Sequence, residues 1–255
     1  MKLFRLITVL TCLTVSLFSL SALAQNGSGS FSPSQVKEIQ KIVHDYLISN
    51  PEVLVQASQA LQQQQAAAAQ KSAMDGIKGN ADSLFNDPKT PTVGNANAPV
   101  EVVEFFDYQC GHCKIMAPVI ESVVKNNSNV KVIFKELPIF GGNSRYAAKA
   151  ALASVAQGKY YKFHNALFAA KSQLDPQTVM KIAKNVGLDT SKLKTAMNAP
   201  WVNQQIRDNF QLAQKLKLMG TPAFIISNST HTKFRFIPGS TSKQNFKQQI
   251  AAVSQ

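Results

Sequence analysis

Two cysteines separated by two residues lie where a short apolar run gives way to a helical pattern. Residues 100–106 are rich in β-branched and aromatic side chains, which predicts a buried strand, and residues 130–137 predict a second one. The tetrapeptide C-G-H-C at 110–113 lies between them and opens a helical segment that ends near Lys125. The order strand, helix, strand predicts two parallel strands joined by a right-handed crossover, with the cysteines at the helix N-terminus.

The position of this motif favours reactive thiols. A cysteine at a helix N-terminus faces unpaired backbone N–H groups and the positive end of the helix dipole, which stabilise the thiolate over the thiol. A protonated His112 between the two cysteines would add to that stabilisation. Cys113 lies one helical turn beyond Cys110, close enough to attack a mixed disulfide formed there and release the partner. The motif therefore predicts redox chemistry at the two thiols.

Two other uses of the cysteines are less well supported by the sequence. A structural disulfide has no need of a helix N-terminus, and closing a loop of four residues constrains the unfolded chain little. A zinc or copper site would need two further ligands, but His44, His164 and His231 show no paired spacing. We therefore expect no metal and no other cofactor.

The first 24 residues have the three regions of a secretory signal peptide. Lys2 and Arg5 precede an apolar stretch that runs to about residue 20, and small residues precede a predicted cleavage site after Ala24. An uncleaved membrane anchor is the alternative, since the stretch could just span a bilayer. Cleavage would remove Cys12, leave only the two cysteines of the motif, and place a soluble protein in the periplasm, where disulfides form.

Residues 31–74 predict a helical segment in front of the first strand. It starts at a Ser-Pro pair that suits a helix N-terminus, and its apolar residues keep helical spacing up to an interruption at residues 50–51. Residues 75–91 are dense in Gly, Asn, Asp and Pro, which predicts a linker to a domain of residues 92–255. Because a linker would separate the helix from that domain, we expect residues 25–74 to pack on a second copy; docking on the same chain is the alternative.

The rest of the chain predicts a helical block followed by a hairpin. Residues 144–218 read as helices, residues 223–227 and 234–238 as two strands, and residues 242–253 as a final helix. The net charge is +13, from 27 Lys and Arg against 14 Asp and Glu. Its lysines are spread singly over predicted helix faces, without the dense basic runs and interleaved aromatics of a nucleic-acid site, so no nucleic acid is expected as a partner.

Two motifs resemble those of the DsbA class of exported bacterial thiol-disulfide oxidoreductases. Residues 103–108, V-E-F-F-D-Y, lead into C-G-H-C, and G-T-P-A-F follows at 220–224. The resemblance covers residues 92–255 and implies an α/β thioredoxin fold with an inserted helical domain at about 141–218. The preceding segment resembles the N-terminal oligomerisation segment of the dimeric DsbA-type proteins of Legionella and Coxiella and of ScsC-like oligomeric relatives.

This resemblance implies roles for individual residues. Cys110 would be the exposed nucleophile and Cys113 the resolving thiol of a redox-active disulfide, with His112 between them. Pro222 would be a cis-proline, beside which the backbone of Thr221 pairs with an extended client segment. A trans proline that opens an edge strand is the alternative.

Three charged residues flank the motif. The resemblance implies that Glu104 is a buried acid that moves a proton to or from the resolving thiol, and an exposed glutamate at a strand end is the alternative. Asp107 and Lys114 read as solvated surface.

Gly111 and Thr221 depart from the commonest DsbA pattern, which has Pro and Val there. Gly-His between the cysteines resembles eukaryotic protein disulfide isomerase, and Thr before the proline resembles the bacterial isomerases. We therefore expect a bifunctional oxidase and isomerase of exported proteins with thiols or disulfides. It would be a homodimer through residues 31–74 and would be recharged by a DsbB-like or DsbD-like membrane partner. A chaperone-like binding protein with a vestigial site and a dedicated reductant are the alternatives.

Overall fold

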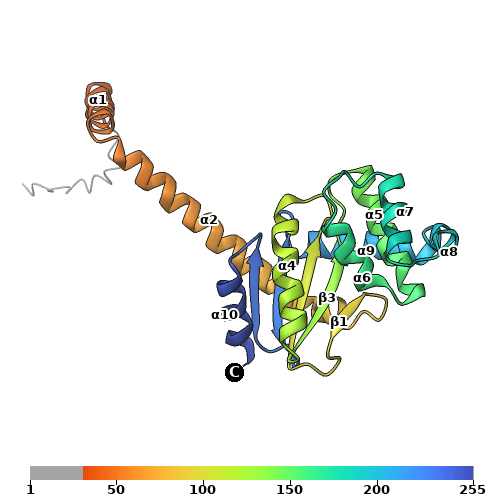
Figure 1. The fold of residues 1–255 in the computed structure, drawn as a ribbon. Coiled ribbons are helices and arrows are strands. Elements are labelled where there is room, and N and C mark those ends of the chain that lie inside the picture. The colour runs from red at the N-terminus through yellow and green to blue at the C-terminus, as the bar shows by residue number, and fades with distance from the viewer. Residues whose placement is uncertain (1–30, 255) are drawn as a thin grey trace, which may run out of the picture. The chain divides into compact units, whose positions relative to one another are not determined.

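The structure is a computed structural model that describes residues 31–254 (Figure 1). The predicted signal peptide lies outside these residues. The chain divides into two compact units, of which the first ends at Gln59 and the second begins at Ala60. No helix within residues 31–254 is both long enough and apolar enough to cross a membrane.

The first unit contains α1 (Pro33–Ser49) and the start of α2 (Glu52–Gly79). A capping box opens α1: the side chain of Ser32 accepts the N–H of Gln35, whose side chain in turn accepts the N–H of Ser32. The break between α1 and α2 lies where the sequence predicts it, at residues 50–51. No residue of α1 is buried. The large apolar side chains of this unit that remain exposed include Phe31, Val36, Ile39, Ile42, Val43, Tyr46, Ile48, Leu54 and Val55.

The segment predicted to be a linker folds onto the second unit instead. α2 continues to Gly79 and α3 (Ala81–Phe85) follows it. Ile77, Leu84 and Phe85 are buried in one apolar cluster with strand and α9 residues. Gly79 ends α2, and Asn80 and Asn86 cap the two ends of α3. In a sequence these residues look the same as the turn formers of a free linker.

The second unit is built on a five-stranded sheet in the order β1-β3-β2-β4-β5. As predicted, β2 (Val100–Phe106) and β3 (Val130–Glu136) are parallel. β4 (Ala223–Asn228) and β5 (Phe234–Pro238) extend the sheet as an antiparallel hairpin. The edge strand β1 (Thr92–Gly94), antiparallel to β3, was not predicted, because three residues are too few to show an alternating pattern.

Both faces of the sheet are covered, which explains why β2 has apolar residues on both of its faces. Val102 and Phe106 of β2 share one cluster with residues of α4 (Gly111–Asn126) and α10 (Lys243–Ser254). Val103 and Phe105, which alternate with them, share the other cluster with α3 and α9 residues. This alternation determines which residues of β2 lie on the side of the sheet that α4 covers.

A block of helices is inserted between β3 and β4 and packs beside the sheet (Figure 1). Its members are α5 (Gly142–Ala153), the 3₁₀ helix η1 (Ser154–Gln157), α6 (Tyr160–Phe168), α7 (Pro176–Asn185), α8 (Thr190–Ala196) and α9 (Pro200–Lys215). The alanine-rich face of α5 and the aromatic face of α6 join the cluster under α4. The predicted α/β fold with a helical insertion is confirmed.

Candidate active site

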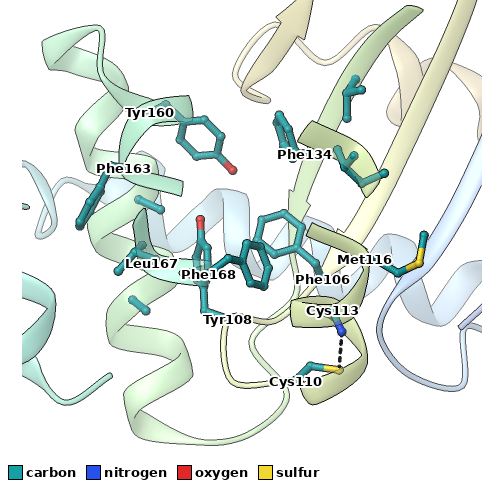
Figure 2. Packing of buried hydrophobic residues seen from close by; sticks show 14 of the residues in the cluster. Phe106, Tyr108, Cys110, Cys113, Met116, Phe134, Tyr160, Phe163, Leu167 and Phe168 are labelled. Atoms are coloured by element: carbon teal, nitrogen blue, oxygen red, sulfur yellow. Dashed lines mark hydrogen bonds between the residues drawn. The ribbon is translucent and has the colours of Figure 1, made fainter. Parts of the chain in front are cut away.

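Cys110 is the N-cap residue of α4, as predicted. Its backbone is extended, with φ −70° and ψ 119°, and its sulfur accepts the N–H of Cys113 at 3.4 Å (Figure 2). The backbone N–H of Lys114 donates to the carbonyl of Cys110 at 3.1 Å and starts the helix. A sulfur therefore occupies the place that a hydroxyl or carboxylate takes at most N-caps, where backbone N–H groups stabilise negative charge.

Both thiols are free and covered by the protein. Cys110 is 3% exposed and Cys113 is fully buried. The expectation of an exposed nucleophile is therefore wrong for this structure, in which the Cys110 thiol lies against the carbonyl of Thr221. Burial raises the pKa of the Cys113 thiol well above its usual range. The two thiols thus differ: one lies at a helix N-terminus, and the other needs a proton acceptor before it can attack.

A loop far along the sequence lies against Cys110. The Thr221–Pro222 peptide bond is cis, so the alternative of a trans proline is wrong. The Cys110 thiol donates to the carbonyl of Thr221 at 3.2 Å. An apolar groove of about 310 Å³ runs beside this loop, and its lining includes Met219, Pro222 and Phe236. Thr221, whose carbonyl accepts the Cys110 thiol, is also part of this lining.

Glu104 is a buried acid and not an exposed strand end. It is 1% exposed and lies on β2 between Val102 and Phe106, on the face that α4 covers. Its Oε1 atom has no hydrogen-bond partner among residues 31–254. Loss of hydration raises the pKa of Glu104 to about 8. The same sheet face therefore holds a carboxyl that can exchange a proton near neutral pH.

The raised pKa of Glu104 predicts that the protein loses stability as the pH rises. The unfolded carboxyl titrates near its ordinary value of 4.5 and the folded one near 8, so the folded state binds the extra proton between these values. The contribution of Glu104 to the free energy of unfolding is thus complete below about pH 4.5. It decreases by roughly 3–6 kcal/mol as the pH rises from there to above about 8. Glu104→Gln should remove this loss, which urea unfolding at pH 5 and pH 8 will measure. An unchanged pH dependence in the variant would contradict the assignment.

His112 lies on the surface next to the cysteines. Its ring is exposed and its Nδ1 atom is 3.2 Å from the hydroxyl of Ser240, in the loop between β5 and α10. The sequence pattern gave no sign of this contact, because 128 residues separate the two partners.

Asp107 is the clearest site residue that sequence reasoning missed. It is 1% exposed, so the prediction of solvated surface is wrong, whereas Lys114 is half-buried. The Asp107 carboxylate accepts the N–H of Gln109 and the hydroxyl of Ser144, both at 2.7 Å, and the N–H of Phe140 at 3.0 Å. Its backbone carbonyl accepts the N–H of Cys110 at 3.1 Å. An aspartate that accepts the N–H two residues later is a common turn former, and this was the available signal.

Glu136 is another buried acid, and the sequence analysis did not identify it. Tyr108 and Tyr160 both donate to its Oε1 atom at 3.0 Å, and the hydroxyl of Tyr108 is 3.0 Å from Nδ1 of His164. Figure 2 shows the hydroxyls of the two tyrosines pointing into the same space between α6 and the sheet. Burial raises the pKa of Glu136 well above its ordinary value and lowers that of His164 to about 3, so the imidazole is neutral. The network joins the active-site loop to the helical insertion.

Comparisons with known proteins match both parts of the chain. The family model described as a DSBA-like thioredoxin domain matches residues 101–251, and the one described as the copper resistance protein ScsC N-terminal domain matches residues 35–68. The crystal structure of BcfH from Salmonella enterica Typhimurium is 32% identical, with 87% of this chain and 97% of that chain covered and a TM-score of 0.72. The thiol-disulfide exchange protein alpha-DsbA2 from Wolbachia pipientis is 31% identical, with 72% and 97% covered and a TM-score of 0.65.

A curated relative matches this chain over only a small part of its own length. The Na(+)/H(+) antiporter NhaA 3 from Salinispora tropica is 26% identical over 140 residues, which are 54% of this chain. The chain spans only 22% of the length of that relative.

Proposed function

The chain belongs to the family of DSBA-like thioredoxin domains, and on this premise we propose that it is an exported thiol-disulfide oxidoreductase that forms and isomerises disulfide bonds in other proteins. The observation that carries the proposal is the placement of Cys110. Its sulfur is the N-cap of α4 and lies 3.2 Å from the carbonyl before the cis-proline. This arrangement stabilises a thiolate and puts it beside a surface that an extended chain can pair with.

In the oxidising direction, a client thiolate attacks the sulfur of Cys110 in the Cys110–Cys113 disulfide. The client–Cys110 bond forms, the bond between the two cysteines breaks, and Cys113 leaves with the electron pair and takes a proton. A second client thiolate then attacks the client sulfur of the mixed disulfide, and Cys110 leaves as a thiolate. The client loses two electrons, and the cysteine pair gains them. The N-terminus of α4 assists the final step because it stabilises the departing thiolate.

In the isomerising direction, the reduced Cys110 thiolate attacks an incorrect client disulfide and forms a mixed disulfide. A different client thiolate then displaces Cys110, so the client keeps its number of disulfides and the enzyme is unchanged. If no client thiol arrives, Cys113 attacks and releases the client. Because Cys113 is buried with a raised pKa, this escape needs a proton acceptor.

We assign that acceptor role to Glu104. It occupies the sheet face beneath α4, and its pKa of about 8 allows it to take and return a proton at neutral pH. Thr221 would pair through its backbone with the client strand, and the apolar groove beside Pro222 would hold apolar client residues next to the cysteine. His112 would add positive charge at the solvent side of Cys110.

The predicted signal peptide supports export to the periplasm, where clients with thiols or disulfides and a DsbB-like or DsbD-like membrane partner would be met. The exposed apolar residues of α1 support a homodimer through residues 31–74. Two active sites on one assembly would hold a misfolded client longer than one site does, which favours isomerisation.

Two assays test the proposed function. The oxidised protein should reactivate reduced ribonuclease, and the reduced protein should reactivate ribonuclease that carries scrambled disulfides. Glutathione buffer alone is the control for both. Activity in the second assay only would restrict the protein to isomerisation, and activity in neither would reject the proposal in favour of a binding protein with a vestigial site.

A further inference from the structure

Asp107 ties the active-site loop to two other segments. Its Oδ1 atom accepts the hydroxyl of Ser144 in the first turn of α5, and its Oδ2 atom accepts the N–H of Phe140 in the loop before α5. The side-chain amide of Gln109 also donates to the hydroxyl of Ser144 at 3.1 Å. The helical insertion therefore holds the Asp107 side chain in one place, next to the turn that leads into Cys110.

The hydrogen-bond pattern around Asp107 is that of a carboxylate. All three donors are N–H or O–H groups, and they use both carboxyl oxygens. A carboxylate only accepts hydrogen bonds, which matches the donors found around both oxygens. Asp107 is thus a buried anion with three hydrogen bonds, which lower the cost of burying its charge.

This anion lies close to the reactive sulfur. Asp107 to Cys110 form a four-residue turn closed by a backbone hydrogen bond of 3.1 Å, and such turns bring their first and last Cα atoms within about 7 Å. The charge of Asp107 contributes to the raised pKa of Glu136, and the backbone of Asp107 forms a hydrogen bond with the Cys113 thiol. Within residues 31–254, Asp107 forms no ion pair with Lys, Arg or His.

We propose that Asp107 limits the oxidising power of the Cys110–Cys113 pair, because its buried charge repels the thiolate that reduction creates at Cys110. The inference rests on the proposed thiol-disulfide exchange. Reduction of the disulfide takes two electrons from a client dithiol and one proton, and it leaves a thiolate at Cys110 and a thiol at Cys113. A fixed anion within roughly 10 Å disfavours that product, and so keeps the disulfide from being a stronger oxidant. A weaker oxidant has a more stable disulfide, so in a given redox buffer it is reduced less often than a stronger oxidant.

The test compares Asp107→Asn with two control variants. Absorbance of the reduced protein at 240 nm follows thiolate formation, and between pH 3 and 8 it reports Cys110 because burial keeps Cys113 protonated. We expect the thiolate fraction of Cys110 at a given subsaturating pH to rise about tenfold in the variant. The equilibrium with glutathione should shift about tenfold toward the reduced enzyme, which corresponds to about 30 mV.

The controls separate charge from tethering. Ser144→Ala removes the hydrogen bond to α5 but keeps the charge, and Asp189→Asn makes the same charge change at the N-cap of α8. Both should titrate within about twofold of wild type. If Asp107→Asn does not fold, Asp107→Ser keeps a turn-forming acceptor without the charge.

Two results would overturn the inference. One is a thiolate titration in the folded Asp107 variant that matches wild type, and the other is an equal shift in Ser144→Ala, which would assign the effect to loop geometry. The titration needs no enzymatic activity. Failure of the wild-type protein to exchange with glutathione would instead reject the proposed function and leave the titration to decide on Asp107.

Discussion

Replacement of Cys110 by serine is expected to abolish disulfide exchange while the fold is kept. Serine is a preferred N-cap residue, and its hydroxyl can accept the N–H of Cys113 as the Cys110 sulfur does. A serine hydroxyl is a weak nucleophile at its ordinary pKa, so it will not attack a disulfide as the Cys110 thiolate does. The rate of ribonuclease reactivation should decrease in both assays by on the order of 10³-fold or more, as it does when other enzymes lose a nucleophile. Circular dichroism and the midpoint of urea unfolding serve as the folding control.

The matching substitution at Cys113 should have a different signature. Cys113→Ser keeps the attacking thiol but removes the group that releases trapped clients, so mixed disulfides with clients should accumulate and appear on non-reducing gels. Oxidation should be lost, because no disulfide can form within the pair. If Cys110→Ser retained client reactivation, or if Cys113→Ser trapped no client, the assignment of attacking and resolving thiols would be wrong.

Local sequence signals were sufficient to predict the frame of the site. The apolar runs of β2 and β3, with a helix between them, predicted the parallel pair and placed Cys110 at a helix N-terminus. These features depend on residues close together in the chain, where period and capping chemistry are informative. The resemblance to the DsbA class added Pro222 and Glu104, which no periodicity could have connected with the cysteines.

The contacts that sequence reasoning missed connect distant segments. Asp107 meets Ser144 37 residues later, and Glu136 meets Tyr108 28 residues earlier. A charged residue at the end of a strand normally marks the exit to solvent, which is why Asp107 was assigned to the surface. Only the packing of the helical insertion against the strand ends turns these positions into an interior.

Charged substitutions on α1 should dissociate the assembly. Ile39 and Val43 lie one turn apart on the apolar stripe of α1 and are 41% and 50% exposed in the single chain. Burial of such side chains against a second copy would contribute about 1.5–3 kcal/mol each, whereas a buried glutamate without a partner is strongly unfavourable. Ile39→Glu with Val43→Glu should therefore reduce the mass measured by light scattering from that of a dimer to that of a monomer. Glutamate has good helix propensity, so α1 itself should survive.

Lys37→Glu is the matched control for this double variant. It makes the chain more negative by the same two charges, but residue 37 lies about 160° around the helix from Ile39. The control should stay dimeric, because the apolar stripe and not the total charge drives assembly.

The monomeric double variant should still oxidise reduced ribonuclease, since each domain carries a complete site. It should lose most of its isomerase activity, since one site holds a scrambled client only briefly. A double variant that remains dimeric would contradict assembly through α1, and a monomer with full isomerase activity would show that isomerisation does not depend on paired sites.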